Sequence, residues 1–317
     1  MAGRNIYSFE GGRRTWPPLT IPLIWAFIYA GVWSSGQIAR LIGLNVTMGS
    51  GRWQDNLAAL FASLPVAGVL WLWLRLWERR GAGATGLLPW APRLFTSGLV
   101  WGLIFVIVIV IAGFATGIYE FAGLGAWAGH LTPIWCFAAV LAVVGTIVQA
   151  TATEALYRGW MLETFTARWG AVSGIVANLV ACFAIQGYGQ IGSPEGMVWA
   201  VNMALMAWLM SVCALRDGSL WGVCGFHAAW NLAIGLGFGL NIDGGRLSMT
   251  PALISMSQRD DAPGWLSGGG YGPDASVLFT VIIVAALFWL LRGRSEKAPR
   301  VSRGRSDHGY GDELIDH

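Results

Sequence analysis

Four polar side chains that could form a hydrolytic site lie within two apolar stretches of the chain. Glu154 and Arg158 are four residues apart, and so are His227 and Asn231. On a helix, each pair therefore shares one face. A carboxylate can take a proton from water, and imidazole or amide N–H groups can stabilise an oxyanion. Ionisable groups in apolar segments are costly and usually functional. The pattern favours acid–base chemistry on two helices.

Each pair also has a purely structural interpretation. Glu154 and Arg158 could be an ion pair that holds a helix in its bundle. His227 and Asn231 could be a hydrogen-bonding pair between helices, worth about 1 kcal/mol per bond. Spacing alone leaves both interpretations open for both pairs.

Composition indicates an integral membrane protein. Of the 317 residues, 55% are hydrophobic and 12% are charged, and the mean hydropathy is +0.57. Apolar runs long enough to cross a bilayer recur along the chain. They predict eight spans, at Ile21–Ile42, Asn56–Leu76, Phe95–Tyr119, Pro133–Ala155, Ala171–Gly187, Gly196–Leu215, Ser219–Leu240 and Ala275–Leu291. We expect residues 241–274 to form an external loop of turns, because they are rich in Gly and Pro.

The basic residues orient these spans. If the amino terminus is inside, the inner segments hold all but four of the 20 Lys and Arg residues; the exceptions are Arg40, Arg52, Arg246 and Arg259. By the positive-inside rule, both termini are predicted to be cytoplasmic. Lys297 is the only lysine, and this bias toward Arg suggests a GC-rich genome and a bacterial plasma membrane.

Three regions follow from this topology. Residues 1–20 form a cytoplasmic amino-terminal segment, and residues 21–292 form the membrane domain. Residues 293–317 are basic and then acidic, and we expect this tail to be disordered in the cytoplasm.

Two motifs in the chain resemble a known family. The segment T-E-A-L-Y-R-G begins at Thr153, and G-S-L-W-G-V-C-G-F-H-A-A-W-N ends at Asn231. They are similar to the E-E-x-x-x-R and H-x-x-x-N motifs of the CPBP family (CAAX protease and bacteriocin-processing, or Abi) of intramembrane proteases. The resemblance covers about residues 133–293. It implies an all-α bundle of about eight transmembrane helices.

The resemblance also assigns roles to residues. In the family, the first glutamate of motif one activates water, and the second pairs with the arginine. Thr153 stands at the first position here, so Glu154 matches the second and Arg158 the arginine. His227 and Asn231 match the residues that hold the oxyanion. Thr153 cannot act as a base without help, and a salt bridge to Arg158 would make Glu154 a weaker one.

The second motif of the family, F-x-x-x-H, is incomplete. The chain has F-A-I-Q-G from Phe183 to Gly187, so a glycine occupies the histidine position. Neighbouring Gln186 and Tyr188 could hold a water molecule by hydrogen bonding, but neither can share a proton as histidine does. For Phe183–Gly187 we favour a helix end that needs small residues.

Other polar residues within the spans are expected to be contacts between helices; they are Gln149, Thr151, Asn178 and Asn202.

Depth along the helices limits how the two pairs could meet. If the fourth span ends near Arg168, Glu154 lies about 21 Å from that edge, whereas His227 lies about 12 Å past Ser219. A shared cavity therefore requires that the fourth span tilts or that its edge lies nearer Trp160.

Two functional classes remain. The first is a CPBP-like intramembrane endopeptidase that cleaves a membrane-associated peptide or protein. The alternative, which Thr153 and Gly187 favour, is an inactive pseudoprotease that serves as a membrane-embedded binding or structural subunit. A small transporter would need charges along a continuous pore.

We expect no cofactor and no metal, since His-Glu-x-x-His and ligand clusters are absent. The expected partners are the lipid bilayer and a peptide or protein, but no nucleic acid.

Overall fold

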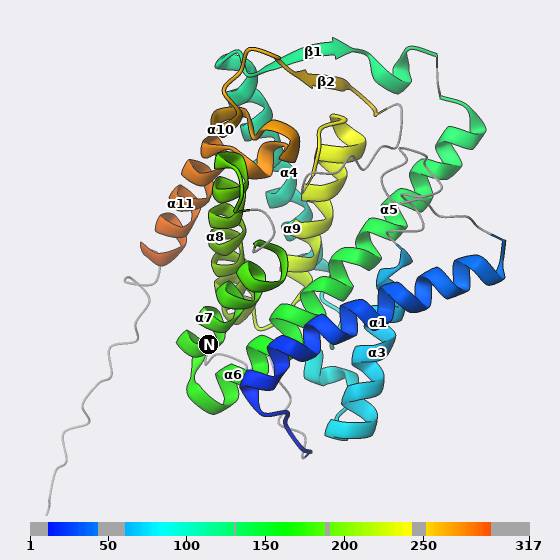
Figure 1. Ribbon diagram of the computed structural model, residues 1–317, viewed down its shortest axis with the longest axis vertical. Helices are drawn as coiled ribbons and strands as arrows, with labels where there is room; N and C mark the ends of the chain where they lie inside the picture. Colours follow the sequence, from blue (N-terminus) through cyan, green and yellow to red (C-terminus); the bar gives the residue numbers. More distant parts are fainter. Residues whose placement is uncertain (1–11, 44–60, 130, 188–190, 243–251, 293–317) are drawn as a thin grey trace, which may run out of the picture.

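Helices make up most of the computed structural model, which describes residues 12–292 except 44–60, 130, 188–190 and 243–251. The longer helices are α1 (Thr20–Leu41), α3 (Ser63–Leu72), α4 (Pro92–Ala115), α5 (Pro133–Glu154), α6 (Leu162–Trp169), α7 (Ala171–Cys182), α8 (Pro194–Asp217), α9 (Trp221–Leu232) and α11 (Val277–Arg292) (Figure 1). The all-α prediction is confirmed, with one small two-stranded sheet added.

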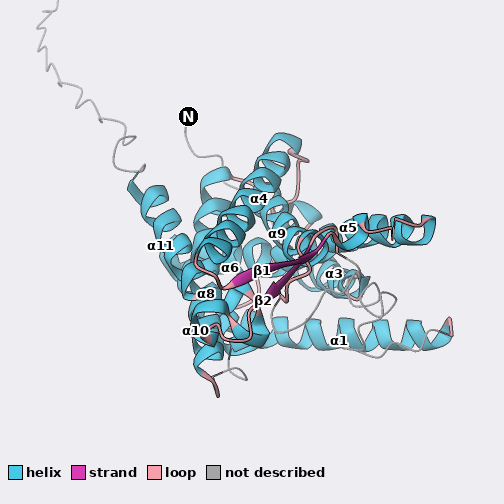
Figure 2. Cartoon of the chain, turned by 90° about the horizontal axis from the view of Figure 1, so that it is seen from above, coloured by secondary structure: helices cyan, strands magenta, loops and turns pink. Residues whose placement is uncertain are grey.

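The helices fall into two groups that meet at the centre of the molecule. Helices α1, α3 and α5 pack together on one side, and α4, α8, α9 and α11 pack on the other (Figures 1 and 2). Contacts between α5 and α9 join the groups. Helix α5 is strongly inclined to α8 and α9 (Figure 1).

Capping side chains, prolines and a glycine mark where α5 and α8 begin and where α8 ends. Thr132 caps α5 by accepting a hydrogen bond from the Trp135 backbone N–H at 3.2 Å. Ser193 caps α8 in the same way through the Gly196 N–H at 3.0 Å. Each cap is followed by proline, which suits the first helical turn. Gly218 ends α8 in the left-handed region, with φ of 63°, where glycine is unstrained.

Helices α4 and α9 approach closely because glycines line their contact. A Cβ on Gly98 would lie 1.9 Å from the Gly222 carbonyl oxygen, and one on Gly225 would lie 2.2 Å from that of Phe95. Gly102 is similarly tight against Phe226. Small residues of this kind let membrane helices pack backbone against backbone. This contact fixes α9, the helix that carries His227 and Asn231.

The sheet joins two loops that were both predicted to be external. Strand β1 (Tyr119–Gly123) pairs antiparallel with β2 (Ser255–Gln258). The Tyr119 hydroxyl donates a hydrogen bond to the Ser267 carbonyl oxygen in the one-turn helix α10 (Gly264–Ser267). The prediction that residues 241–274 contain only turns was therefore wrong, because pairing with β1 supplies order that local composition does not reveal.

Helix boundaries differ from the predicted spans in two places. Helix α4 ends at Ala115, before Gly117 with φ of 71°, and Tyr119 begins β1 instead of ending the third span. The fourth helix does not stop at Ala155. It continues as a π-helix over Ala155–Met161 and then as α6 to Trp169.

Among the described residues, four helical segments are long and apolar enough to cross a membrane. These segments are Pro17–Leu41, Pro92–Ala115, Pro133–Trp169 and Pro194–Asp217. Ala171–Ile185 and Val277–Arg292 are shorter apolar helices. An integral membrane protein is thus supported, and the eight-span topology and the orientation of the termini remain predictions. The tail at 293–317, predicted to be disordered, lies outside the described residues.

Candidate active site

The site begins where α5 changes its helical form. Glu154 is the last residue of α5, and all seven residues of the following π-helix, Ala155–Met161, are buried. π-Helical turns occur frequently at functional sites. Gly159 in this segment packs against the backbone of Thr85. A Cβ added at Gly159 would lie 2.5 Å from the Thr85 carbonyl oxygen. Close packing on every side therefore holds Glu154 and Arg158 in place.

Glu154 contacts both predicted partners through one oxygen. Its Oε1 lies 2.8 Å from His227 Nδ1 and 3.3 Å from Arg158 Nη1. The Glu154 side chain is 1% exposed, whereas that of His227 is 20% exposed. The other carboxylate oxygen, Oε2, is buried and makes no hydrogen bond to any residue in the described part of the chain. The carboxylate is thus oriented by two neighbours while one oxygen keeps its capacity to accept.

Asn231 is held by a residue that we expected to be only a helix contact. Asn231 Nδ2 donates to Gln149 Oε1 on α5 at 3.2 Å. The expected contact between helices is present, and Gln149 also belongs to the site. An amide nitrogen carries two hydrogens, so Asn231 has a second donor beyond the one that Gln149 accepts.

A small cavity collects these side chains. Its volume is about 140 Å³. The lining residues come from α5, its π-helical extension, α7, α8, α9, the segment before α11 and α11 itself: Gln149, Thr153, Glu154, Arg158, Cys182, Met203, Met206, Met210, Phe226, His227, Trp230, Asn231, Asp274 and Phe279. All four residues proposed from the sequence therefore line one cavity. The polar groups lie mainly on α5 and α9, and methionines of α8 line another part.

The comparison with protein families agrees with this geometry. Residues 133–233 match the family model described as type II CAAX prenyl endopeptidase Rce1-like. The match confirms the resemblance to the CPBP family. It begins where α5 begins and ends just after Asn231, so it includes both motifs that build the cavity. No curated protein and no solved structure gives a significant match to the chain.

Two departures from the CPBP motifs can now be placed. Thr153, at the position of the family's first glutamate, lines the cavity beside Glu154. Phe183–Gly187, which stands where the family has F-x-x-x-H, forms a π-helix that continues α7. Tyr188 lies outside the described residues. The cavity thus has a hydroxyl where the CPBP pattern has a carboxylate.

Two buried amides in the CPBP-like segment serve the fold. Asn178 Nδ2 donates to the Gly174 carbonyl oxygen within α7. Asn202 Nδ2 donates to the carbonyl oxygens of Asp274 and Ser276 at 2.8 and 3.0 Å. Asn202 is fully buried and does not line the cavity. Among the described residues, no group of three or more His, Cys, Asp or Glu side chains could hold a metal ion.

A second polar cluster, which the sequence did not reveal, lies beside the helix that carries the site. Arg80 donates to both oxygens of Glu163 at 2.9 Å and to Glu78 Oε2 at 3.1 Å. Glu78 Oε1 also accepts hydrogen bonds from the Thr15 hydroxyl and from Trp160 Nε1. Glu78 and Glu163 are fully buried. We call these three charged residues the Glu78–Arg80–Glu163 cluster.

The cluster ties distant parts of the chain together. Burial opposes the charged form of Arg80, but Glu163 and Glu78 outweigh it and raise the Arg80 pKa above its usual value. The amino-terminal segment joins through Thr15, and also through Arg14, whose Nε lies 3.1 Å from Glu163 Oε1. The cluster anchors α6 to the segments before α1 and after α3. No spacing in the sequence signals it, because Glu78 and Arg80 lie more than 80 residues from Glu163 and more than 60 residues from Thr15.

Proposed function

We propose that this chain is a membrane-embedded endopeptidase that hydrolyses a peptide bond in a membrane-associated peptide or protein. One observation carries the proposal. Glu154 Oε1 is held by His227 and Arg158, while Oε2 is buried and has no hydrogen-bond partner among the described residues. A carboxylate arranged in this way is oriented by one oxygen and able to accept a proton with the other.

The roles of the other residues follow from their contacts. His227 uses Nδ1 toward Glu154, so its Nε2 is the atom left to face a substrate. Asn231 keeps one amide hydrogen beyond the one given to Gln149. After Glu154 takes a proton from water and the hydroxide attacks the carbonyl carbon, the Asn231 amide N–H would stabilise the oxyanion, joined by His227 Nε2–H when both ring nitrogens of His227 carry hydrogen. Collapse of this intermediate then breaks the C–N bond, and Glu154 returns the proton to the leaving amine. Donors that are fixed before reaction are worth about 10²–10³-fold in rate each.

A different function has its own support. Thr153 occupies the place of a second carboxylate in the cavity, and Glu154 is partly engaged by Arg158. These features favour a pseudoprotease that binds a membrane partner without cutting it. The two functions predict opposite results in one assay.

The assay uses the full chain, purified in detergent and reconstituted into vesicles, with a fluorescence-quenched, prenylated peptide that ends in a CAAX sequence. We expect cleavage by the wild type, and losses of at least about 10²-fold in both Glu154→Gln and His227→Ala. Mass spectrometry of the products identifies the bond that is cut. Glu120→Gln is the matched control, because Glu120 is an exposed carboxylate on β1, outside the cavity.

Three results separate the functions. Loss of cleavage in both variants at equal protein level supports the endopeptidase. Cleavage that survives Glu154→Gln refutes the role of Glu154. If the wild type retains the peptide on the vesicles without cutting it, and His227→Ala abolishes that retention, the pseudoprotease is supported.

A further inference from the structure

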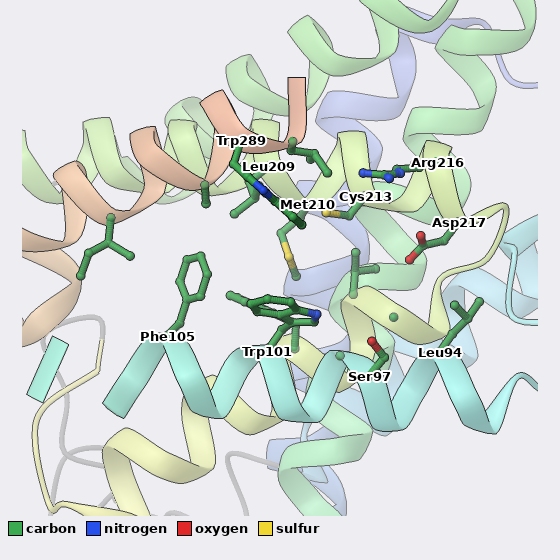
Figure 3. Close-up of a pocket in the computed structure, with 17 residues that line it drawn as sticks. Leu94, Ser97, Trp101, Phe105, Leu209, Met210, Cys213, Arg216, Asp217 and Trp289 are labelled. Atoms are coloured by element: carbon green, nitrogen blue, oxygen red, sulfur yellow. The ribbon is translucent and has the colours of Figure 1, made fainter. Parts of the chain in front are cut away.

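A second and larger cavity lies next to the site and is not part of it. Its volume is about 550 Å³, and it lies between α4, α8, α9 and α11 (Figure 3). This is within the range of about 300–1,000 Å³ typical of ligand sites. Most of its lining is apolar, including Trp101, Phe105, Leu209 and Trp289. We call it the α4–α11 slot.

One end of the slot carries opposite charges. Arg216 and Asp217, the last two residues of α8, both line it near Ser97 of α4, whereas Phe105 lies toward the other end (Figure 3). Both charged side chains are exposed. Neither makes a side-chain hydrogen bond within the part of the chain that the structure describes. A cation and an anion thus stand side by side at the helix ends, with an apolar channel leading away from them.

The outer helices of the slot face the surroundings of the bundle. Trp101 on α4 and Trp289 on α11 are 49% and 67% exposed, and their ring centroids lie 6.2 Å apart. Both line the slot. In a membrane protein, such exposed apolar side chains contact lipid, and tryptophan is enriched near the headgroups. The slot is therefore accessible to bilayer lipid between α4 and α11.

We propose that the α4–α11 slot binds a phospholipid whose headgroup carries a primary ammonium, such as phosphatidylethanolamine. Arg216 would pair with the phosphate and Asp217 with the ammonium, and one acyl chain would run along the apolar lining past Phe105 and Leu209. Charge complementarity selects this occupant. An anionic headgroup without an amine would be repelled by Asp217, and a purely hydrocarbon ligand would leave both charges without a partner.

The proposal does not depend on peptidase activity, so it is tested by binding. The full chain is stripped of lipid in detergent and then offered defined mixtures of phosphatidylethanolamine, phosphatidylglycerol and phosphatidylcholine. Native mass spectrometry counts the lipids retained. We expect one retained phosphatidylethanolamine and weaker retention of the other two lipids.

Variants separate the charges from the channel. Arg216→Gln should weaken retention of all three phospholipids by about tenfold, the effect of one charge-assisted hydrogen bond. Asp217→Asn should abolish the preference for phosphatidylethanolamine over phosphatidylglycerol. Ala286→Phe, which places a ring within the slot lining, should remove retention altogether. Arg168→Gln, an exposed arginine on α6 outside the slot, is the control.

Each outcome decides the proposal. Equal retention of the three lipids by the wild type, or unchanged retention in Asp217→Asn and Ala286→Phe, would overturn it. Melting temperatures confirm that the variants are folded. A photo-crosslinking residue at Ile282 in the living cell gives an independent test. Crosslinks to an aminophospholipid support the proposal, and crosslinks mainly to a protein segment would show that the slot holds a peptide and overturn it.

Discussion

Replacing Arg80 by leucine should destabilise the protein more than most single changes. The substitution removes three hydrogen bonds of 2.9–3.1 Å and leaves Glu78 and Glu163, both fully buried, without their shared cation. Breaking a buried ion pair from one side costs about 3–5 kcal/mol. Arg14→Leu removes the ion pair with Glu163 made by a side chain that is 35% exposed, and ion pairs near the surface contribute about 0–1 kcal/mol.

The assay is equilibrium unfolding in mixed detergent and SDS micelles, followed by tryptophan fluorescence. A double-mutant cycle adds a sharper criterion. Glu163→Leu in the Arg80→Leu background removes a stranded carboxylate, so it should cost less than it does alone, with a coupling of about 1–3 kcal/mol. A loss no greater than that of Arg14→Leu would refute the reasoning.

Other substitutions test the packing and the site. Gly98→Ala forces a methyl group to 1.9 Å from the Gly222 carbonyl oxygen and should cost about 1–3 kcal/mol in the same assay, whereas Gly68→Ala, at an open position, should be neutral or stabilising. Asn202→Leu leaves two buried carbonyl oxygens without their donor and should cost about 1–3 kcal/mol; an unchanged midpoint would contradict this. Thr153→Glu adds a second carboxylate to the cavity but should change peptide cleavage by less than about tenfold, because Glu154 already supplies the base; a gain of about 10²-fold with the same quenched peptide would mean that Glu154 is not the base in the wild type.

The sequence predicted the site better than its surroundings. Hydropathy located the helices, and the two i, i+4 pairs named residues that line one cavity. Gln149 was recognised as a helix contact, and only its partner, Asn231, shows that it also belongs to the site. Local patterns succeed where a motif lies on one helix, since helical spacing fixes which side chains share a face.

What the sequence missed depends on contacts between distant residues. Glu78 and Glu163 looked like ordinary charges at helix ends, because nothing local shows that Arg80 reaches both. The pairing of β1 with β2 joins residues more than 100 positions apart. The fourth span was predicted to end at Ala155, whereas helical structure continues to Trp169 and includes Glu163, which Arg80 contacts.

The π-helix at Ala155–Met161 restricts how this protein can evolve. It separates Glu154, in the cavity, from Glu163, in the Glu78–Arg80–Glu163 cluster, on one continuous run of helix. Losing one residue from this segment would turn one glutamate relative to the other by about 100°. Either Glu154 would then no longer point into the cavity, or Glu163 would no longer point toward Arg80. Natural variants should therefore tolerate substitutions in this segment far better than insertions or deletions.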